Sequence, residues 1–508
     1  MWELLRGLRK KDSTFFLTLT GILLSILLVG TVACGGGETT QKTEEKTVPE
    51  TVKEPVPTPV EKTVPEAPSA RDKVAHISDI HFNPFFDVTL MARLIKYGPD
   101  QWEAIFASST VEGYGTYGKN ETNYNLLKVS LENMAAVYKN PDFVIFTGDF
   151  IAHEFHDRFK TANNGSLEGL DPFIKKTVTF MVLMFKRYFP NVPVYFSLGN
   201  NDSYAGDYLL APAGQFLKDT TSIVSVNWLY SGANKTSFST TYPIGGYYTV
   251  VPPNLQNARV ISLNTIFFSV KFQTDFTEYD PAEKQLEWFE AQLKAAKVKN
   301  EKVWLLLHIP PGTNVYSTLH DNQYKSFWKT AYNAKFLKLV TTYSSVFTAG
   351  FAGHTHMDDF RLVFDRSAEP LKAAMFIHIC PAVSPQFGNN PGFRYLDNAP
   401  GTFSVNNYEV YYLDLGIETP GEWAKEYSFK KTYGQTGVNA ASMQAVYSAI
   451  KDDMTKRTDY MNYYDVNHRQ ALTPENFNAY WCGIGNLQQD DFEECNKAGN
   501  QLEVGSKK

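Results

Sequence analysis

One short pattern constrains this chain more than any other: an apolar run of strand length that stops at an aspartate, asparagine or histidine. It occurs at residues 74–78, 143–146, 193–198, 302–307 and 346–352. Runs of this length, rich in β-branched and aromatic residues, predict buried strands. Because ligands bind at the carboxyl ends of strands in open α/β sheets, we expect the polar residues that follow to gather at one edge.

The residues that follow these runs are of kinds that bind metal ions. They are Asp79, His81, Asp149, Asn200, His308, His354 and His356, with His153 shortly after Asp149 and Asn201 directly after Asn200. Carboxylate, amide and imidazole groups suit zinc, iron or manganese, and the set contains no thiolate. Glycines at 148, 199, 350 and 353 would allow tight turns and a close approach of the backbone to an ion.

The order D-x-H, GD, GN-N, H and GH-x-H resembles that of the calcineurin-like metallophosphoesterases, over about residues 72 to 415. The resemblance implies an α/β fold, a four-layer α/β/β/α sandwich of two mixed sheets, with a site for two divalent ions. It assigns Asp79, His81, Asp149 and His356 to one ion, and Asp149, Asn200, His308 and His354 to the other. Two ions so held would generate a hydroxide that attacks phosphorus. Zinc is favoured, with iron or manganese as alternatives.

Three further stretches are similar to those of the acid sphingomyelinase-like phosphodiesterases: His153 after GD, HIPPG at 308–312 and YG-x-YG at 114–118. In that branch the histidine after GD donates a proton to the leaving group, which assigns this catalytic role to His153. Most members have GNH where this chain has Asn201. An amide can hydrogen-bond a phosphoryl oxygen but cannot deliver a proton. The GNND stretch is also similar to that of the endopolyphosphatases, so the substrate stays open.

The leading hypothesis is a two-metal phosphodiesterase that is sphingomyelinase-like, with nucleotide or phosphocholine-type diesters among its candidate substrates. A polyphosphatase or a phosphomonoesterase would use the same site. A third alternative, a non-catalytic surface binding protein on a phosphoesterase scaffold, is disfavoured because every metal ligand of the family is present. A net charge of −6 and a pI near 6.0 argue against a nucleic-acid surface, so no nucleic acid is expected as a partner.

Residues 1–34 have the pattern of an export signal or membrane anchor. Basic residues between 6 and 11 precede an apolar run from 15 to 33, which is long enough to cross a bilayer uncleaved. The run ends in TVACG, which is similar to a bacterial lipobox except that threonine stands where leucine is usual. A lipidated Cys34 and an uncleaved anchor both predict an exported, membrane-tethered protein that faces the periplasm or the cell exterior.

The rest of the chain divides into three parts. Residues 35–70 are rich in Pro, Glu, Lys and Thr, which predicts a disordered linker. Residues 71–420 are expected to form the catalytic domain, and residues 421–508 a helical extension. Within that extension, Cys482 and Cys495 are expected to form a disulfide, as befits an exported protein.

Periodicity and composition predict the elements around the five motif strands. Apolar spacing favours helices over 121–139, 170–189 and 281–299, and strands over 258–264, 360–365, 374–380 and 407–415. The aromatic-rich segment 83–120 follows the first motif strand. It predicts either a wall of the pocket or a surface insertion with an aromatic cluster of its own.

Overall fold

The structure is a computed structural model that describes residues 73–506 except 254, 256, 273–278, 400 and 417–420. The predicted export signal with Cys34 and the predicted linker lie outside the described residues. Within the described ranges, no helix has the length and apolar composition that a bilayer span requires.

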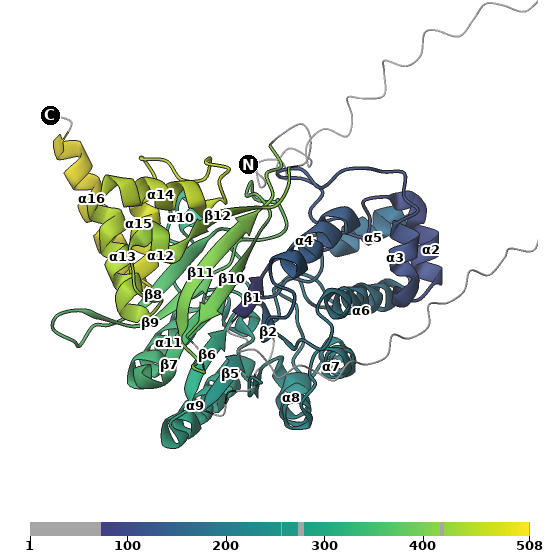
Figure 1. The fold of residues 1–508 in the computed structure, drawn as a ribbon, viewed down its shortest axis with the longest axis horizontal. Coiled ribbons are helices and arrows are strands. Elements are labelled where there is room, and N and C mark those ends of the chain that lie inside the picture. The colour runs from purple at the N-terminus through teal and green to yellow at the C-terminus, as the bar shows by residue number, and fades with distance from the viewer. Residues whose placement is uncertain are drawn as a thin grey trace, which may run out of the picture. The chain divides into compact units, whose positions relative to one another are not determined.

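Two six-stranded sheets lie at the centre of the described chain (Figure 1). The first consists of β1 (Lys73–Ile77), β2 (Phe143–Phe146), β3 (Val194–Phe196), β10 (Gly392–Asn398), β11 (Val405–Tyr412) and β12 (Ala424–Ser428). Its order is β12-β11-β10-β1-β2-β3. Strands β1, β2 and β3 are parallel, whereas β10, β11 and β12 pair antiparallel, so the sheet is mixed.

The second sheet is also mixed. It consists of β4 (Tyr248–Val250), β5 (Ala258–Ser262), β6 (Lys302–Leu306), β7 (Phe347–Ala352), β8 (Asp359–Asp365) and β9 (Lys372–Ile379). The order is β4-β5-β6-β7-β9-β8, with a parallel centre from β5 to β9 and antiparallel pairing at both edges. The parallel strands of the two sheets carry the five predicted motifs.

The two sheets pack face to face around one aromatic core. The ring of Phe143 on β2 lies 5.7 Å from that of Trp304 on β6, and the ring of His76 on β1 lies 5.3 Å from that of Phe351 on β7. All four side chains are buried. Burying rings between the sheets removes a large apolar area from water, which fixes one sheet against the other.

Helices cover the outer faces of both sheets. They are α2 (Met91–Lys96), α3 (Trp102–Phe106), α4 (Tyr124–Val137), α5 (Phe155–Ala162), α6 (Leu170–Tyr188), α7 (Gln215–Asn227), α8 (Gly232–Gly245), α9 (Pro281–Lys299), α10 (Val315–Asp321), α11 (Thr330–Thr342), α12 (Phe429–Tyr433), α13 (Ala440–Asp452), α14 (Met454–Tyr464), α15 (Phe477–Gly485) and α16 (Gln489–Ser506). On the first sheet, Phe185 of α6 packs on Phe146. On the second, Phe289 of α9 packs on Phe347, and α11, α13 and α15 contact β8 or β9. The predicted four-layer sandwich is confirmed.

Three long helices form where their apolar spacing predicts them, as α4, α6 and α9. The start of α9 shows why: the Asp280 side chain accepts hydrogen bonds from the backbone N–H groups of Ala282 and Glu283, and Pro281 occupies the first turn. Segment 83–120 differs from the prediction of an aromatic cluster of its own. Its Trp102 and Phe106 pack on Phe180 of α6, so its rings extend the main core.

The C-terminal region is mainly helical, as predicted, but it also supplies a strand. Strand β12 lies beyond residue 420 and forms the edge of the first sheet, although its sequence gives little strand signal. Helices α13 to α16 lie beside the second sheet, at one end of the view in Figure 1. The predicted disulfide between Cys482 and Cys495 is confirmed. The division into a catalytic domain and an extension at residue 420 stays a prediction.

Candidate metal centre

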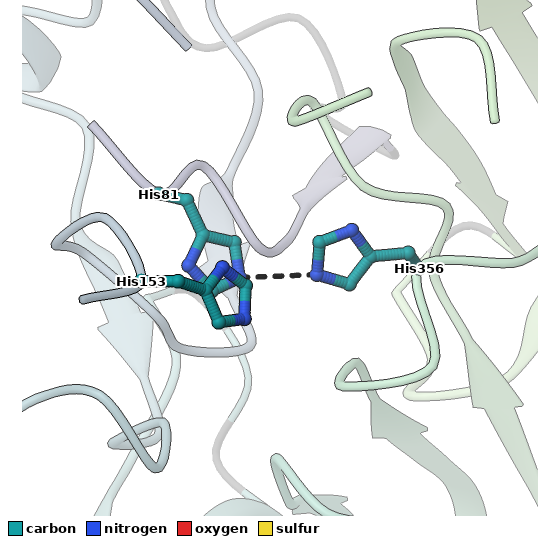
Figure 2. A group of neighbouring side chains, drawn as sticks. All are labelled: His81, His153 and His356. Carbon is teal, nitrogen blue, oxygen red and sulfur yellow. Dashed lines mark hydrogen bonds between the residues drawn. The ribbon is translucent and has the colours of Figure 1, made fainter. Parts of the chain in front are cut away.

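The residues that follow β1, β2, β3, β6 and β7 come together at one site. His81, His153 and His356 form one group of potential metal ligands, and Asp79, Asp149 and His308 form a second. Within each group the potential ligand atoms all lie within 4.8 Å of one another. Figure 2 shows the first group, with the His153 ring lying against that of His81 and the His356 ring facing them. The polar residues that follow these strands therefore gather at one place, as the sequence predicts.

Asp149 belongs to the second group and also contacts the first. Its Oδ2 atom is 3.3 Å from Nε2 of His81 and 3.2 Å from Nε2 of His308. The same Nε2 atom of His81 lies 3.0 Å from Nε2 of His356. One carboxylate thus faces histidines from both sheets, which is the position that a bridging ligand requires.

The remaining predicted ligands lie around these residues. Nε2 of His308 is 3.1 Å from Oδ1 of Asn200, and its ring centroid is 5.1 Å from that of His354. Oδ1 of Asp79 is 3.6 Å from Nε2 of His356. The structure therefore brings all seven predicted residues together; that they bind metal stays a prediction.

The backbone at this site adopts a conformation that is rare for residues other than glycine. Asp79, His81, Asp149, His354 and His356 all have positive φ, between 47° and 73°. Aspartate and histidine tolerate the left-handed region better than most residues, but each such residue still costs free energy. Strain of this kind concentrates at functional sites, where the surrounding structure imposes it.

A glycine makes room for one of the carboxylates. At Gly353, which precedes His354, a Cβ atom would lie 2.1 Å from Oγ of Ser78 and 2.3 Å from Oδ2 of Asp79. Both contacts are far shorter than real Cβ atoms make. Any side chain at 353 would therefore displace Asp79, so the glycine of the GHTH motif is required by packing.

Hydrogen bonds to backbone carbonyls orient two of the histidines. Nδ1 of His81 lies 3.2 Å from the Ile151 carbonyl oxygen, and Nδ1 of His308 lies 2.6 Å from that of Thr147. Because Nδ1–H donates to a carbonyl, Nε2 of each ring faces the centre and would offer its lone pair once its proton is lost. Lone pairs that converge in this way fit a bound cation.

Two aspartates outside the predicted set hold the Asn200 loop. Oδ1 of Asp207 accepts a 2.7 Å hydrogen bond from the Asn200 side-chain amide, which turns the Asn200 oxygen towards His308. The fully buried Asp202 carboxylate accepts from the backbone N–H groups of Asp149, Phe150 and Gly199. Burial, together with the Asp149 charge, raises the pKa of Asp202 to about 7.

The histidines of the centre differ in their affinity for protons. Burial lowers the pKa of His81 and His308, but neighbouring carboxylates, above all Asp149, outweigh it and raise each pKa to about 9. Burial, reinforced by neighbouring histidines, lowers the pKa of His354 and His356 well below the usual value. Neutral imidazole is the form that binds metal, so an ion would displace protons from the first pair.

His153 lies at the partly exposed side of the centre. Its ring stacks on that of His81, with centroids 4.0 Å apart and an interplanar angle of 18°. Its Nδ1 atom lies 3.1 Å from Oε1 of the fully buried Glu121, and Arg158 also contacts this oxygen. No other described residue hydrogen-bonds Nε2 of His153, so this nitrogen is available to a substrate.

Asn201 contacts the carboxylate of Asp149. Its backbone N–H donates to Oδ1 of Asp149 at 2.9 Å, and its side-chain amide donates to Oδ2 at 3.1 Å. The backbone N–H and one side-chain N–H are thus engaged with the Asp149 carboxylate. In this geometry Asn201 orients Asp149, while a direct contact with a phosphoryl oxygen stays a prediction.

Comparison with known proteins decides the family. Residues 72–358 match the calcineurin-like phosphoesterase family, which is more than half of the chain. The chain belongs to this family. The match covers all five strand-end motifs, so the family resemblance and the site geometry concern the same residues.

The relatives narrow the assignment to the acid sphingomyelinase-like branch. The phosphoesterase is 26% identical over 458 residues to the cyclic GMP-AMP phosphodiesterase SMPDL3A of Mus musculus, covering 85% of this chain and 94% of the relative. It is 27% identical over 455 residues to sphingomyelinase phosphodiesterase C of Dictyostelium discoideum, covering 84% and 93%. It is 24% identical over 440 residues to the human acid sphingomyelinase-like phosphodiesterase 3b, covering 83% and 90%. The chain is therefore a metal-dependent phosphoric ester hydrolase.

Among solved structures, similarity extends to a dimetal phosphatase from Danio rerio, with 14% identity and a TM-score of 0.37. This match covers 70% of the phosphoesterase and 99% of that chain. A second match is to PhoD, with 11% identity and a TM-score of 0.38, covering 72% and 70%.

Sequence reasoning missed three residues that shape the site: Glu121, Asp207 and Phe387. Glu121 stands at the start of a predicted helix, where a glutamate is expected on the surface, yet it is fully buried against His153. Phe387 lies in the loop between β9 and β10, and its ring packs edge-on against His356 with centroids 4.5 Å apart. Glu121 and Phe387 act on residues about 30 positions away in the sequence, and no local pattern marks any of the three.

Proposed function

We propose that this phosphoesterase is an exported, membrane-tethered phosphodiesterase that hydrolyses small phosphodiesters at a two-metal centre. The observation that carries the proposal is the position of Asp149, whose Oδ2 atom lies 3.3 Å from His81 and 3.2 Å from His308. The names of the relatives support a diester substrate, of a nucleotide or a phosphocholine type.

The family resemblance implies which residues would hold each ion, and all of them lie at this site. Asp79, His81 and His356 would bind one ion, Asn200, His308 and His354 the other, and Asp149 both. Bound divalent ions would polarise the phosphoryl oxygens and lower the pKa of the attacking water. The mixed nitrogen and oxygen ligands favour zinc, with iron or manganese as alternatives.

The chain's own residues would handle the leaving group. His153 would donate a proton from Nε2 to the departing oxygen, while its Nδ1–H is held by the Glu121 carboxylate. Glu121 is a positioning residue, because it touches His153 and fixes the ring's orientation. Asn201 would keep the Asp149 carboxylate turned towards both groups of ligands.

The first test compares two substrates with the same leaving group. Full-length protein loaded with zinc, manganese or iron is expected to hydrolyse bis(p-nitrophenyl) phosphate faster than p-nitrophenyl phosphate, and chelation should abolish both activities. Preference for the monoester would instead indicate a phosphomonoesterase. Metal-replete protein that is inert on all phosphoesters would indicate a binding protein.

Two further measurements address the substrate and the tether. Polyphosphate incubated under the same conditions is expected to keep its length, and shortening would favour the polyphosphatase alternative. For the tether, a fatty-acid label on the expressed protein should disappear in Cys34→Ala. A membrane-bound but unlabelled wild type would instead indicate an uncleaved anchor.

A further inference from the structure

An exposed aromatic ring lies directly beside the metal centre. Phe387 is 54% exposed, although phenylalanine is usually buried. Its ring makes edge-to-face contacts with His356, at 4.5 Å and 79°, and with His153, at 5.6 Å and 86°. Phe387 therefore contacts both a predicted metal ligand and the predicted proton donor.

The loop that carries Phe387 is held against the first motif strand. The backbone N–H groups of Val383 and Ser384 donate to the carbonyl oxygens of Ser78 and Asp79. Within the loop, the fully buried Asn389 side chain donates to the Ser384 carbonyl oxygen at 3.1 Å. These bonds tie the base of the loop to the site itself.

Two other segments hold the tip of the same loop. The Gly118 N–H donates to the Pro385 carbonyl oxygen at 3.2 Å, which links the loop to the YG-x-YG stretch. From the C-terminal region, Nδ1–H of His468 donates to the Gly388 carbonyl oxygen, and the His468 ring stacks on Tyr117 at 4.0 Å. Segment 83–120, predicted as a wall of the pocket or an insertion, thus helps to position a residue at the site.

A ring held in this way is already in place before a substrate binds. Isolated exposed hydrophobic residues are common and need no function. Phe387 differs because its loop is fixed from three segments and its ring meets His153 and His356 at right angles, not face to face. Phe387 stays 54% exposed despite both contacts, so part of its ring is left for another partner. Preorganised contacts of this kind add affinity at little entropic cost.

We infer that Phe387 is a specificity-determining residue whose exposed face stacks on a planar aromatic part of the leaving group, such as a nucleobase. The inference rests on the proposed diesterase function of the same site. In that reaction water supplies the new oxygen on phosphorus, the P–O bond to the leaving group breaks, and His153 protonates the departing oxygen. Because Phe387 contacts His153, the group beside it is the leaving group.

The test uses two diesters that differ in planar area but have leaving groups of similar basicity, methyl phenyl phosphate and methyl 2-naphthyl phosphate. Wild-type full-length protein is expected to favour the naphthyl ester in kcat/KM. In Phe387→Leu that preference should fall by about tenfold, the scale of one stacking contact. Phe387→Trp should keep it. Tyr316→Leu is the matched control, because Tyr316 is also an exposed aromatic but its ring packs on His320.

The outcomes separate the inference from the proposed function. An unchanged naphthyl-to-phenyl ratio in Phe387→Leu, or an equal loss on both esters, would overturn stacking while the diesterase activity of the wild type stands. Absence of diesterase activity in the wild type would overturn the proposed function. If Phe387→Leu does not fold, Phe387→Trp decides: a retained or increased ratio supports stacking, and a lost preference contradicts it.

Discussion

The metal centre and the cluster around Glu426 and Arg394 are both buried and both charged, yet their polar atoms are arranged differently. At the metal centre, second residues orient the side chains: Asp207 holds Asn200, and a backbone carbonyl holds His81. Among the predicted ligands, the exception is Nδ1 of His356, which is buried and has no partner among the described residues.

The second cluster lacks such support. Both carboxylate oxygens of Glu426 are buried and, within the described chain, accept no hydrogen bond. Nε and Nη1 of Arg394 are also without partners there, although Nη2 bonds to Asp358 and the guanidinium lies 4.7 Å from the Tyr408 ring.

The two regions differ in what their buried polar groups do. Those of the metal centre serve function, whereas those around Glu426 and Arg394 lower the stability of the fold. Polar atoms that converge on one point, each with its orientation fixed, prepare a site for a cation. Buried polar atoms without hydrogen-bond partners lose their hydration and gain no compensating bond, which destabilises the fold. Substitutions in the first region should therefore change activity, and a substitution in the second should change stability.

The largest effect is expected at Asp149, which would bind both ions. Asp149→Asn should lower bis(p-nitrophenyl) phosphate turnover by about a thousandfold or more, since losing a metal's charge stabilisation costs several kcal/mol. Metal analysis should show a parallel loss of bound ions. Asp157→Asn, at an exposed position of α5, is the control. Full retention of both ions would contradict the bridging role.

The next effect is expected at the proton donor. His153→Ala should slow esters with poor leaving groups by about a hundredfold or more, because general acid catalysis contributes on this scale. Nitrophenyl esters need little protonation and should lose much less. Steady-state rates on both kinds of ester measure this, with His320→Ala as a control outside the site. Equal losses on both kinds of ester would rule out the acid role.

A smaller effect is expected from weakening the hydrogen bond between His153 and Glu121. Glu121→Gln keeps the size of the side chain but removes the charge that holds Nδ1–H, so rates on poor leaving groups should fall about tenfold. In a His153→Ala background the same substitution should have almost no effect, because its target is gone. Additive losses in the double variant would show that Glu121 acts through another residue.

The smallest effect concerns stability in the second cluster. Burial raises the pKa of Glu426 well above its usual value; Asp358 and Asp465 add to the shift, while Arg394 and Arg469 oppose it. The folded chain therefore keeps a proton that the unfolded chain releases above its own, lower pKa. Wild-type stability should thus fall as pH rises from that pKa towards the folded one.

Glutamine has no proton to lose, so Glu426→Gln should stabilise the fold as pH rises. We expect its melting temperature to exceed that of the wild type by about 2 °C near pH 8, and by less near pH 5. Thermal unfolding of both proteins across this range is the measurement. The exposed Glu422→Gln should show no such trend, and a difference independent of pH would contradict the explanation.

The elements whose signals are local can be predicted from the sequence. The five strand-end motifs, the helix that begins at Pro281 and the two cysteines of the C-terminal region can be recognised from residue type and spacing, because strand length, helix period and capping depend on neighbours in the chain. The family's order of motifs then predicts the ligand set.

The contacts that support these residues arise only in the folded chain. Glu121 meets His153, the Asn201 amide turns to Asp149, and Phe387 reaches His356, in each case from a separate segment of the chain. The edge strand β12 likewise forms because β11 is there to pair with it. Such contacts depend on which segments the packed sheets bring together, and no local period or propensity encodes that proximity.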